Sequence, residues 1–300
     1  HSFPTRRSSD LPFPLYARDL MDPADAAGLE DRINTMMAAR PVGGHTVDIP
    51  ATLQEIAGWQ SQVDRVLASP LADRAYFYGF DEFLDPMKPS VKQVFGEMKR
   101  RYPQIPIMTT STAVNIDAAT MRGLNIDWLC VMFDYYDRAK ATQVRRDDPQ
   151  LQVWSYISFQ PGYPYVNFMV EYPLIDSRIC AWQCFSEEDD GFLYWGLNQY
   201  WQSGCLDQTR RPVDPADGPY LKWSKRTSAD GQLFDDIHGD GKILIYGKDG
   251  PIGSIVLENI RDGMEDYDYL ALLKQLRGVE AAETIARELA PSFTECRRDP

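Results

Sequence analysis

The chain has 300 residues, 44% of them hydrophobic, which is enough to bury one large core or two smaller ones. Its 31 basic and 44 acidic residues give a net charge of -13, which argues against nucleic acid or an anionic membrane as the main partner. No apolar run approaches the roughly 20 residues needed to cross a bilayer, so no transmembrane segment is expected.

Cysteine and histidine usage argues against a metal or disulfide framework. The five cysteines form no Cys-x-x-Cys pair, and the three histidines do not cluster with them, so we expect no metal and no cofactor. Cys180 and Cys184 lie one helical turn apart and are expected to be free, buried thiols.

The first residues do not read as native protein. Residues 1–11 resemble read-through from a sequencing adapter, so we expect a non-native segment there and one barrel domain over residues 12–300. The chain starts without a methionine, so the lack of a signal peptide is uninformative about the compartment.

Two helices are expected before the first long strand. Apolar residues recur at helical spacing over residues 22–37, and Pro41 and Gly43-Gly44 would end that helix. Thr52 and Glu55 resemble a capping box that begins a second helix, which would continue to about residue 67.

The most informative stretch is residues 74–83, an apolar and aromatic run that stops at Asp81 and Glu82. It predicts a buried strand with two carboxylates at its C-terminal end, where parallel α/β proteins place their chemistry. The alternative is a surface turn, which also begins well with Asp and Glu.

Strand and helix patterns then alternate along the chain. We expect helices at 91–101, 118–124 and 175–185, a polar helical stretch after residue 136, and further strands at 105–109, 128–133, 151–157 and 192–195. Such alternation predicts parallel strands with helical crossovers. Too little chain precedes Tyr76 for three more units, so the expected fold is a (β/α)8 TIM barrel incomplete at its N-terminal end. The tail adds a short strand at 241–246 and a long helix at 257–276.

The spacing of Asp81 and Glu82 restricts their chemistry. Neighbouring residues have Cα atoms about 3.8 Å apart, so the two carboxylates cannot easily flank a sugar from opposite faces as most glycosidase pairs do. They can serve one face, which suits hydrolysis assisted by a 2-acetamido group of the substrate.

Five ordered motifs between residues 71 and 276 together resemble the catalytic domain of glycoside hydrolase family 123 and its uncharacterised relatives. They are Tyr78-Gly79-Phe80-Asp81-Glu82, Gly162-Tyr163-Pro164-Tyr165, Tyr172-Pro173-Leu174-Ile175-Asp176-Ser177-Arg178, Gly191-Phe192-Leu193-Tyr194-Trp195 and Ile260-Arg261-Asp262-Gly263-Met264-Glu265-Asp266-Tyr267.

The resemblance implies a (β/α)8 barrel and a retaining exo-β-N-acetylgalactosaminidase activity by substrate assistance. Glu82 would be the general acid/base, and Asp81 would polarise the acetamido group. The chain departs from the family at Tyr246-Gly247-Lys248 and at Val256, where relatives often have Tyr-Pro-Gly and Arg. Related enzymes are typically exported, so a periplasmic, cell-surface or secreted location is expected.

Residues at or near other strand ends could contact the sugar. The candidate substrate-binding residues are Tyr78, Asp134, Tyr135, Tyr156, Trp195 and Asn198. For each aromatic residue, core packing is the alternative. We expect structural roles for Arg178, Trp182, Glu258, Arg261 and Asp262, which fall on or near predicted helices.

Two rival functions stay open. The chain could be a glycan-binding or structural barrel that has kept the carboxylate pair without turnover, or a hydrolase for a sugar without an acetamido group. In each case the expected partner is an oligosaccharide or glycoconjugate, and the oligomeric state is open.

Overall fold

A computed structural model describes residues 49–70, 72–111, 115–197, 239–245 and 251–298, together with the backbone of 13–15, 205–206, 212–213, 226–227 and 233–234. The chain divides into two compact units, which we describe one at a time. The first unit comprises Ser9–Val131 and Ala139–Trp154, and the second comprises His1–Ser8, Met132–Arg138 and Ser155–Pro300. The helix expected at 22–37 lies outside the described residues.

Parallel strands form the centre of the first unit. Strand β2 (Ala75–Tyr78) pairs in parallel with β1 (Phe13–Leu15) and with β3 (Ile107–Thr110), and β3 pairs in parallel with β4 (Trp128–Met132). The backbone amide of Gln152, where β5 (Gln152–Ile157) begins, donates to the carbonyl of Asp127 at 3.0 Å. Strands β3 and β4 are buried along their whole length, as expected for a sheet covered on both faces.

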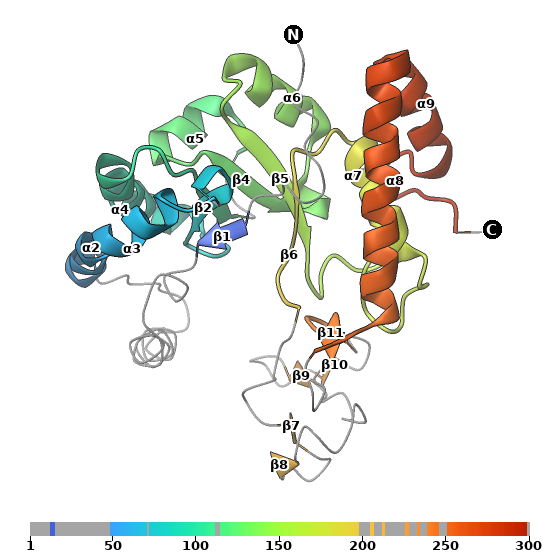
Figure 1. Cartoon of the computed structure of the whole chain (residues 1–300), viewed down its shortest axis with the longest axis horizontal. Coiled ribbons are helices and arrows are strands. Elements are labelled where there is room, and N and C mark those ends of the chain that lie inside the picture. Colours follow the sequence, from blue (N-terminus) through green and yellow to red (C-terminus); the bar gives the residue numbers. More distant parts are fainter. Residues whose placement is uncertain are drawn as a thin grey trace. The chain divides into compact units, whose positions relative to one another are not determined.

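Helices follow the strands of this unit in alternation. They are α2 (Ile49–Gly58), α3 (Gln60–Leu67), α4 (Lys88–Arg101), α5 (Ala118–Leu124) and α6 (Arg138–Asp147). Helix α4 contacts both α2 and α5 (Figure 1). The predicted helices at 91–101 and 118–124 are confirmed, although α4 begins three residues earlier, at Lys88, with a proline in its first turn.

The helix predicted to begin at Thr52 differs from the structure in two ways. It begins at Ile49, so the proposed capping box is wrong, and it is divided into α2 and α3 at Trp59. Gly58 has a low helix propensity, which favours a break there. Ile56 and Val63 are nonetheless fully buried, as the apolar spacing predicts.

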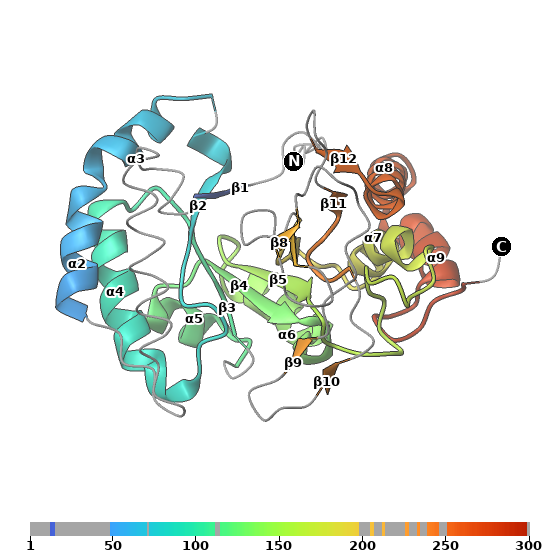
Figure 2. The ribbon, with the colours of Figure 1, turned by 90° about the horizontal axis from the view of Figure 1, so that it is seen from below.

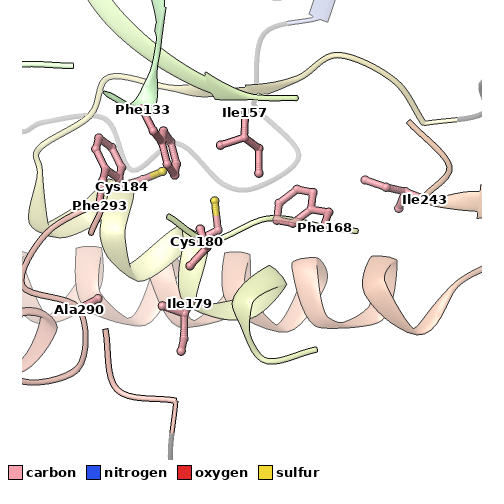
Figure 3. Packing of buried hydrophobic residues seen from close by; sticks show 10 residues of the cluster. Phe133, Ile157, Phe168, Ile179, Cys180, Cys184, Ile243, Ala290 and Phe293 are labelled. Atoms are coloured by element: carbon pink, nitrogen blue, oxygen red, sulfur yellow. The ribbon is translucent and has the colours of Figure 1, made fainter. Parts of the chain in front are cut away.

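Strands β5 and β6 (Phe192–Tyr194) pair in parallel within the second unit, beside three packed helices. Helices α7 (Asp176–Ser186), α8 (Ile255–Arg277) and α9 (Val279–Leu289) contact one another and lie side by side in Figures 1 and 2. An apolar cluster packs α7 against the strands and the C-terminal segment of this unit. Figure 3 labels nine of its residues: Phe133, Ile157, Phe168, Ile179, Cys180, Cys184, Ile243, Ala290 and Phe293. Cys180 and Cys184 are free, buried thiols, as expected.

Close helix packing accounts for several residues of the recognised motifs. A Cβ on Gly263 of α8 would lie 2.5 Å from the carbonyl oxygen of Arg178 on α7, so only glycine fits this contact. The Arg178 guanidinium donates to both oxygens of Asp266 at 2.6 and 2.9 Å, and Trp182 Nε1 donates to the same carboxylate at 2.9 Å. Arg178 and Trp182 are therefore structural, as expected.

The sheet order gives the fold class. In the first unit β1 to β4 pair in parallel in chain order, and in the second unit β5 pairs in parallel with β6. Most of these strands are followed by a helix, which makes the protein α/β and consistent with part of a TIM-like barrel. The antiparallel pair of β11 (Leu244–Ile245) and β12 (Ile252–Gly253) precedes α8, so the expected C-terminal strand and long helix are present. None of the helices that the structure describes is long and apolar enough to cross a bilayer.

Two further antiparallel pairs lie in the segment before residue 239. They are β7 (Cys205–Leu206) with β8 (Pro212–Val213) and β9 (Arg226–Thr227) with β10 (Leu233–Phe234). The loop predicted at 203–219 therefore contains a short strand pair.

Candidate active site

Asp81 and Glu82 lie in a tight turn directly after β2, and both side chains are exposed. The residues on either side of Asp81 have left-handed backbone conformations, with φ of 55° at Phe80 and 48° at Glu82. Such values are uncommon for residues other than glycine and persist only where neighbouring groups hold them. The turn therefore needs contacts that fix it.

The contacts come from three consecutive residues at the end of β3, which we call the β3 hydroxyl row: Thr109, Thr110 and Ser111. All three are buried, with exposures of 0 to 1%. Thr109 Oγ1 donates to the carbonyl of Phe80 at 2.9 Å, and Ser111 Oγ donates to the carbonyl of Phe83 at 3.0 Å. The Phe83 amide donates to the Thr110 carbonyl at 3.3 Å. The row thereby holds both ends of the turn.

The middle hydroxyl of the row contacts the Asp81 carboxylate and the backbone of Glu82. Thr110 Oγ1 lies 2.8 Å from Asp81 Oδ1, and it accepts a hydrogen bond from the backbone amide of Glu82 at 2.7 Å. Tyr78 also donates its hydroxyl hydrogen to Asp81 Oδ1, at 2.5 Å. One oxygen of Asp81 thus accepts two hydroxyl hydrogen bonds from within the same unit.

Tyr78 keeps its proton in this arrangement. Burial of the phenol, and then the negative charge of Asp81, raise the pKa of Tyr78 well above its ordinary value. The hydroxyl is therefore a hydrogen-bond donor across the working pH range. Tyr78 was a candidate substrate-binding residue, and its hydroxyl instead contacts Asp81, so direct sugar binding by Tyr78 stays a prediction.

The four other candidates that the structure describes belong to the second unit. Asp134 and Tyr135 follow β4 in a short 3-10 helix, Phe133–Tyr135, and both are exposed, Tyr135 at 51%. Partial burial raises the pKa of Asp134, and burial followed by the charge of Asp134 raises the pKa of Tyr165. Asp134 and Tyr165 therefore lie within electrostatic reach of each other, and a carboxylate with a phenol can bind sugar hydroxyls.

Trp195 follows β6, and its indole is hydrogen-bonded to Asp240, 45 residues later in the chain. Its Nε1 donates to Oδ1 of Asp240 at 2.7 Å, and the hydroxyl of Tyr194 lies 3.5 Å from the same oxygen. Asp240 is 7% exposed, and burial raises the pKa of Tyr194. The Gly241 amide donates to the Tyr194 hydroxyl at 3.0 Å. Asp240 thus fixes the orientation of a partly exposed indole.

The remaining candidates are less accessible or not described. Tyr156 is 3% exposed, so the structure favours core packing for its ring. Asn198 lies outside the described residues, as does the departure at 246–248. Val256 packs partly buried against the apolar cluster of the second unit.

The residue pattern did not single out Thr110 or Asp240. The signal for Thr110 was available: four consecutive hydroxyl residues, 109–112, begin at the end of the predicted strand, which is unusual for a buried strand. Asp240 sits in a Gly-Asp-Gly turn that supplies no signal for its bond to Trp195, 45 residues earlier.

Comparison with known proteins assigns the chain to a family. The sequence profile named "Glycoside hydrolase 123, catalytic domain" matches residues 82–273, which is more than half of the chain. By class, the matching profile describes the catalytic domain of a glycoside hydrolase. It belongs to glycoside hydrolase family 123. The match begins at Glu82, directly after Asp81.

Two solved structures resemble the chain. A family 123 glycoside hydrolase from Clostridium perfringens, studied for glycolipid glycan hydrolysis, aligns with a TM-score of 0.50 at 16% identity and covers 76% of this chain. At this low identity the likeness shows the fold alone. This chain spans 36% of that enzyme's length. A protein named as a glycerophosphoryl diester phosphodiesterase from Silicibacter pomeroyi DSS-3 aligns at 15% identity over 49% of this chain and 41% of its own. Its TM-score of 0.32 is too low to indicate a shared fold. No curated protein sequence matches the chain.

Proposed function

We propose that the protein is a retaining exo-glycoside hydrolase that removes terminal β-linked N-acetylhexosamine, with N-acetylgalactosamine as the preferred sugar. The observation that carries this proposal is the pair of adjacent, exposed carboxylates of Asp81 and Glu82 at the end of a parallel strand. Membership of family 123 supports the reaction class. We further propose that the complete catalytic domain closes as a (β/α)8 barrel.

In the proposed first step, the carbonyl oxygen of the substrate's 2-acetamido group attacks the anomeric carbon as the bond to the leaving oxygen breaks. Glu82 donates its proton to that leaving oxygen, and Asp81 accepts a hydrogen bond from the acetamido N–H, whose nitrogen becomes positively charged. The product of this step is a cyclic oxazolinium ion and the released alcohol.

In the second step, Glu82 takes a proton from water, whose oxygen attacks the anomeric carbon from the face that the leaving group occupied. The oxazolinium ring opens and the acetamido group is restored, so the sugar keeps its β configuration. A pair of neighbouring carboxylates suits this route because neither needs to reach the opposite face of the ring.

The proposal is tested by release of nitrophenol from β-N-acetylgalactosaminide, β-N-acetylglucosaminide and plain β-galactoside, for the wild type and for Glu82→Gln. We expect hydrolysis of an acetamido sugar only, and its loss in the variant. Equal hydrolysis of the plain galactoside would indicate a glycosidase without substrate assistance. Binding of the sugars without turnover would indicate a glycan-binding barrel.

A further inference from the structure

The number of hydroxyl hydrogens determines which groups donate to Asp81. Thr110 has one hydroxyl hydrogen, and its oxygen already accepts from the Glu82 amide, so that hydrogen is free to point at Asp81 Oδ1. The Tyr78 hydroxyl also has one hydrogen, and the shorter of its two contacts, 2.5 Å against 3.2 Å to Thr110, is with Asp81. Both hydrogens are thereby assigned to the same carboxylate oxygen.

The two oxygens of Asp81 therefore differ. Oδ1 accepts from Thr110 and Tyr78, whereas Oδ2 receives no hydrogen bond from any residue that the structure describes. The terminal torsion of an aspartate is broad and poorly determined by the side chain alone. Two converging donors on one oxygen fix that torsion, and with it the direction of the other oxygen.

Resting on the proposed function, we propose that Thr110 and Tyr78 are positioning residues that hold Oδ1 of Asp81 and reserve Oδ2 for the amide N–H of the substrate's 2-acetamido group. Thr110 also contacts the next residue, because the same hydroxyl oxygen accepts a hydrogen bond from the backbone amide of Glu82. One side chain of β3 thus links the residue that polarises the acetamido group to the residue that moves the proton.

The network suits positioning better than it suits stability alone. Tyr78 and Met108 are register partners on β2 and β3, and Thr110 lies two residues beyond Met108, on the same face. Thr109 and Ser111 already hold the backbone of the turn through the carbonyls of Phe80 and Phe83. The contacts of Thr110 and Tyr78 with a charged, exposed carboxylate are additional to that support.

The test compares isosteric variants that lose only a hydroxyl. Thr110→Val and Tyr78→Phe remove one donor each, and Thr110→Ser restores the hydroxyl without the methyl group. Matched controls lie in the same unit. Tyr102→Phe removes a buried hydroxyl that donates to the Ile56 carbonyl at 2.9 Å, and Thr120→Val removes a hydroxyl that donates to Asp117 at 2.7 Å.

We expect kcat on a nitrophenyl N-acetylhexosaminide to fall about 10- to 100-fold in Thr110→Val and in Tyr78→Phe, with KM within about threefold of the wild type. A second readout is inhibition by the thiazoline analogue of the oxazolinium ion, whose inhibition constant is expected to rise about tenfold or more in both variants. Thr110→Ser should regain most of kcat, and both controls should stay within about twofold of the wild type in each quantity.

Melting temperature separates positioning from loss of fold. If Thr110→Val fails to fold, Tyr78→Phe and Thr110→Ser still test the proposal. The positioning role is overturned if Thr110→Val and Tyr78→Phe both fold and keep kcat and the thiazoline inhibition constant within about twofold of the wild type. The proposed function would still stand in that case. A wild type that neither hydrolyses an acetamido sugar nor binds the thiazoline overturns the proposed function, and the positioning role with it.

Discussion

Tyr78 donates a hydrogen bond of 2.5 Å to Asp81, three residues later in the chain, across the turn that ends β2. The Tyr78 side chain is half-buried, whereas the carboxylate that it binds is exposed. A half-buried donor therefore holds an accessible acid, which is an arrangement that suits a preorganised carboxylate.

Removing the acid/base should leave a reaction that an added nucleophile can complete. We expect Glu82→Gln to lower kcat by about 10²- to 10⁴-fold. Azide needs no general base, so it should attack the oxazolinium ion and restore the release of nitrophenol, with a β-glycosyl azide as product. Mass spectrometry of the product and the rate against azide concentration measure both effects.

The control for that experiment is Glu97→Gln. Glu97 is on α4, where it pairs with Arg100 and Arg101, and it should keep wild-type activity with no response to azide. A Glu82→Gln protein that stays inactive in azide and still binds substrate would contradict the two-step route.

Asp240 should affect binding through Trp195. Asp240→Ala removes the acceptor of the indole N–H, so the ring loses its fixed orientation. If Trp195 stacks on the sugar, KM should rise about tenfold, corresponding to about 1.4 kcal/mol, with a smaller change in kcat. Asp240→Asn keeps an oxygen acceptor and should stay close to the wild type. An unchanged KM in Asp240→Ala would remove Trp195 from the substrate site.

Two helix glycines should respond oppositely to alanine. Gly263→Ala places a methyl group 2.5 Å from the carbonyl of Arg178, so we expect a loss of about 1–3 kcal/mol in the free energy of unfolding. Gly123→Ala on α5 meets nothing within 4 Å and should gain about 0.5–1 kcal/mol from helix propensity. Urea unfolding of both variants measures the difference, and equal stabilities would contradict the close α7–α8 contact.

Asp189 should make the protein less stable as the pH rises. It is 7% exposed, Ser155 donates a hydrogen bond to it, and burial raises the pKa of its carboxyl well above the ordinary value. Between the unfolded pKa, about 3.9, and the higher folded pKa, the native state binds more protons than the unfolded chain. The free energy of unfolding therefore falls with rising pH through that window, and the contribution is fully present only below it.

The corresponding variant is Asp189→Asn, which mimics the protonated carboxyl. We expect its melting temperature to decline less than that of the wild type between pH 4 and 7. Glu280→Gln, an exposed substitution on α9, should keep the wild-type slope. The same slope in Asp189→Asn as in the wild type would show that the carboxyl does not stay protonated in the native state.

Local patterns predicted the elements more reliably than their long-range contacts. The run of β-forming residues before Asp81 and the helical spacing at 118–124 each describe an element that forms from neighbours in sequence, and both are confirmed. The division of a helix at Trp59 was missed because apolar spacing continues across the break, from Ile56 to Val63.

The candidate site shows the same limit. Asp81 and Glu82 were recognisable because a carboxylate pair ends a hydrophobic strand. The role of Thr110 depends on the register that pairs Tyr78 with Met108, and no periodicity in one strand specifies the register with another. The bond from Trp195 to Asp240 likewise joins residues whose approach is decided by tertiary packing.

In the proposed reaction the substrate's own acetamido group is the nucleophile. The most direct measurement is kcat/KM for nitrophenyl N-acetylgalactosaminides whose acetyl methyl carries zero to three fluorines, because fluorine withdraws electrons from the attacking oxygen. We expect kcat/KM to decline steeply, by at least about 100-fold from the acetyl to the trifluoroacetyl sugar, or about 2.7 kcal/mol of activation free energy. A kcat/KM that is independent of fluorine content would contradict it.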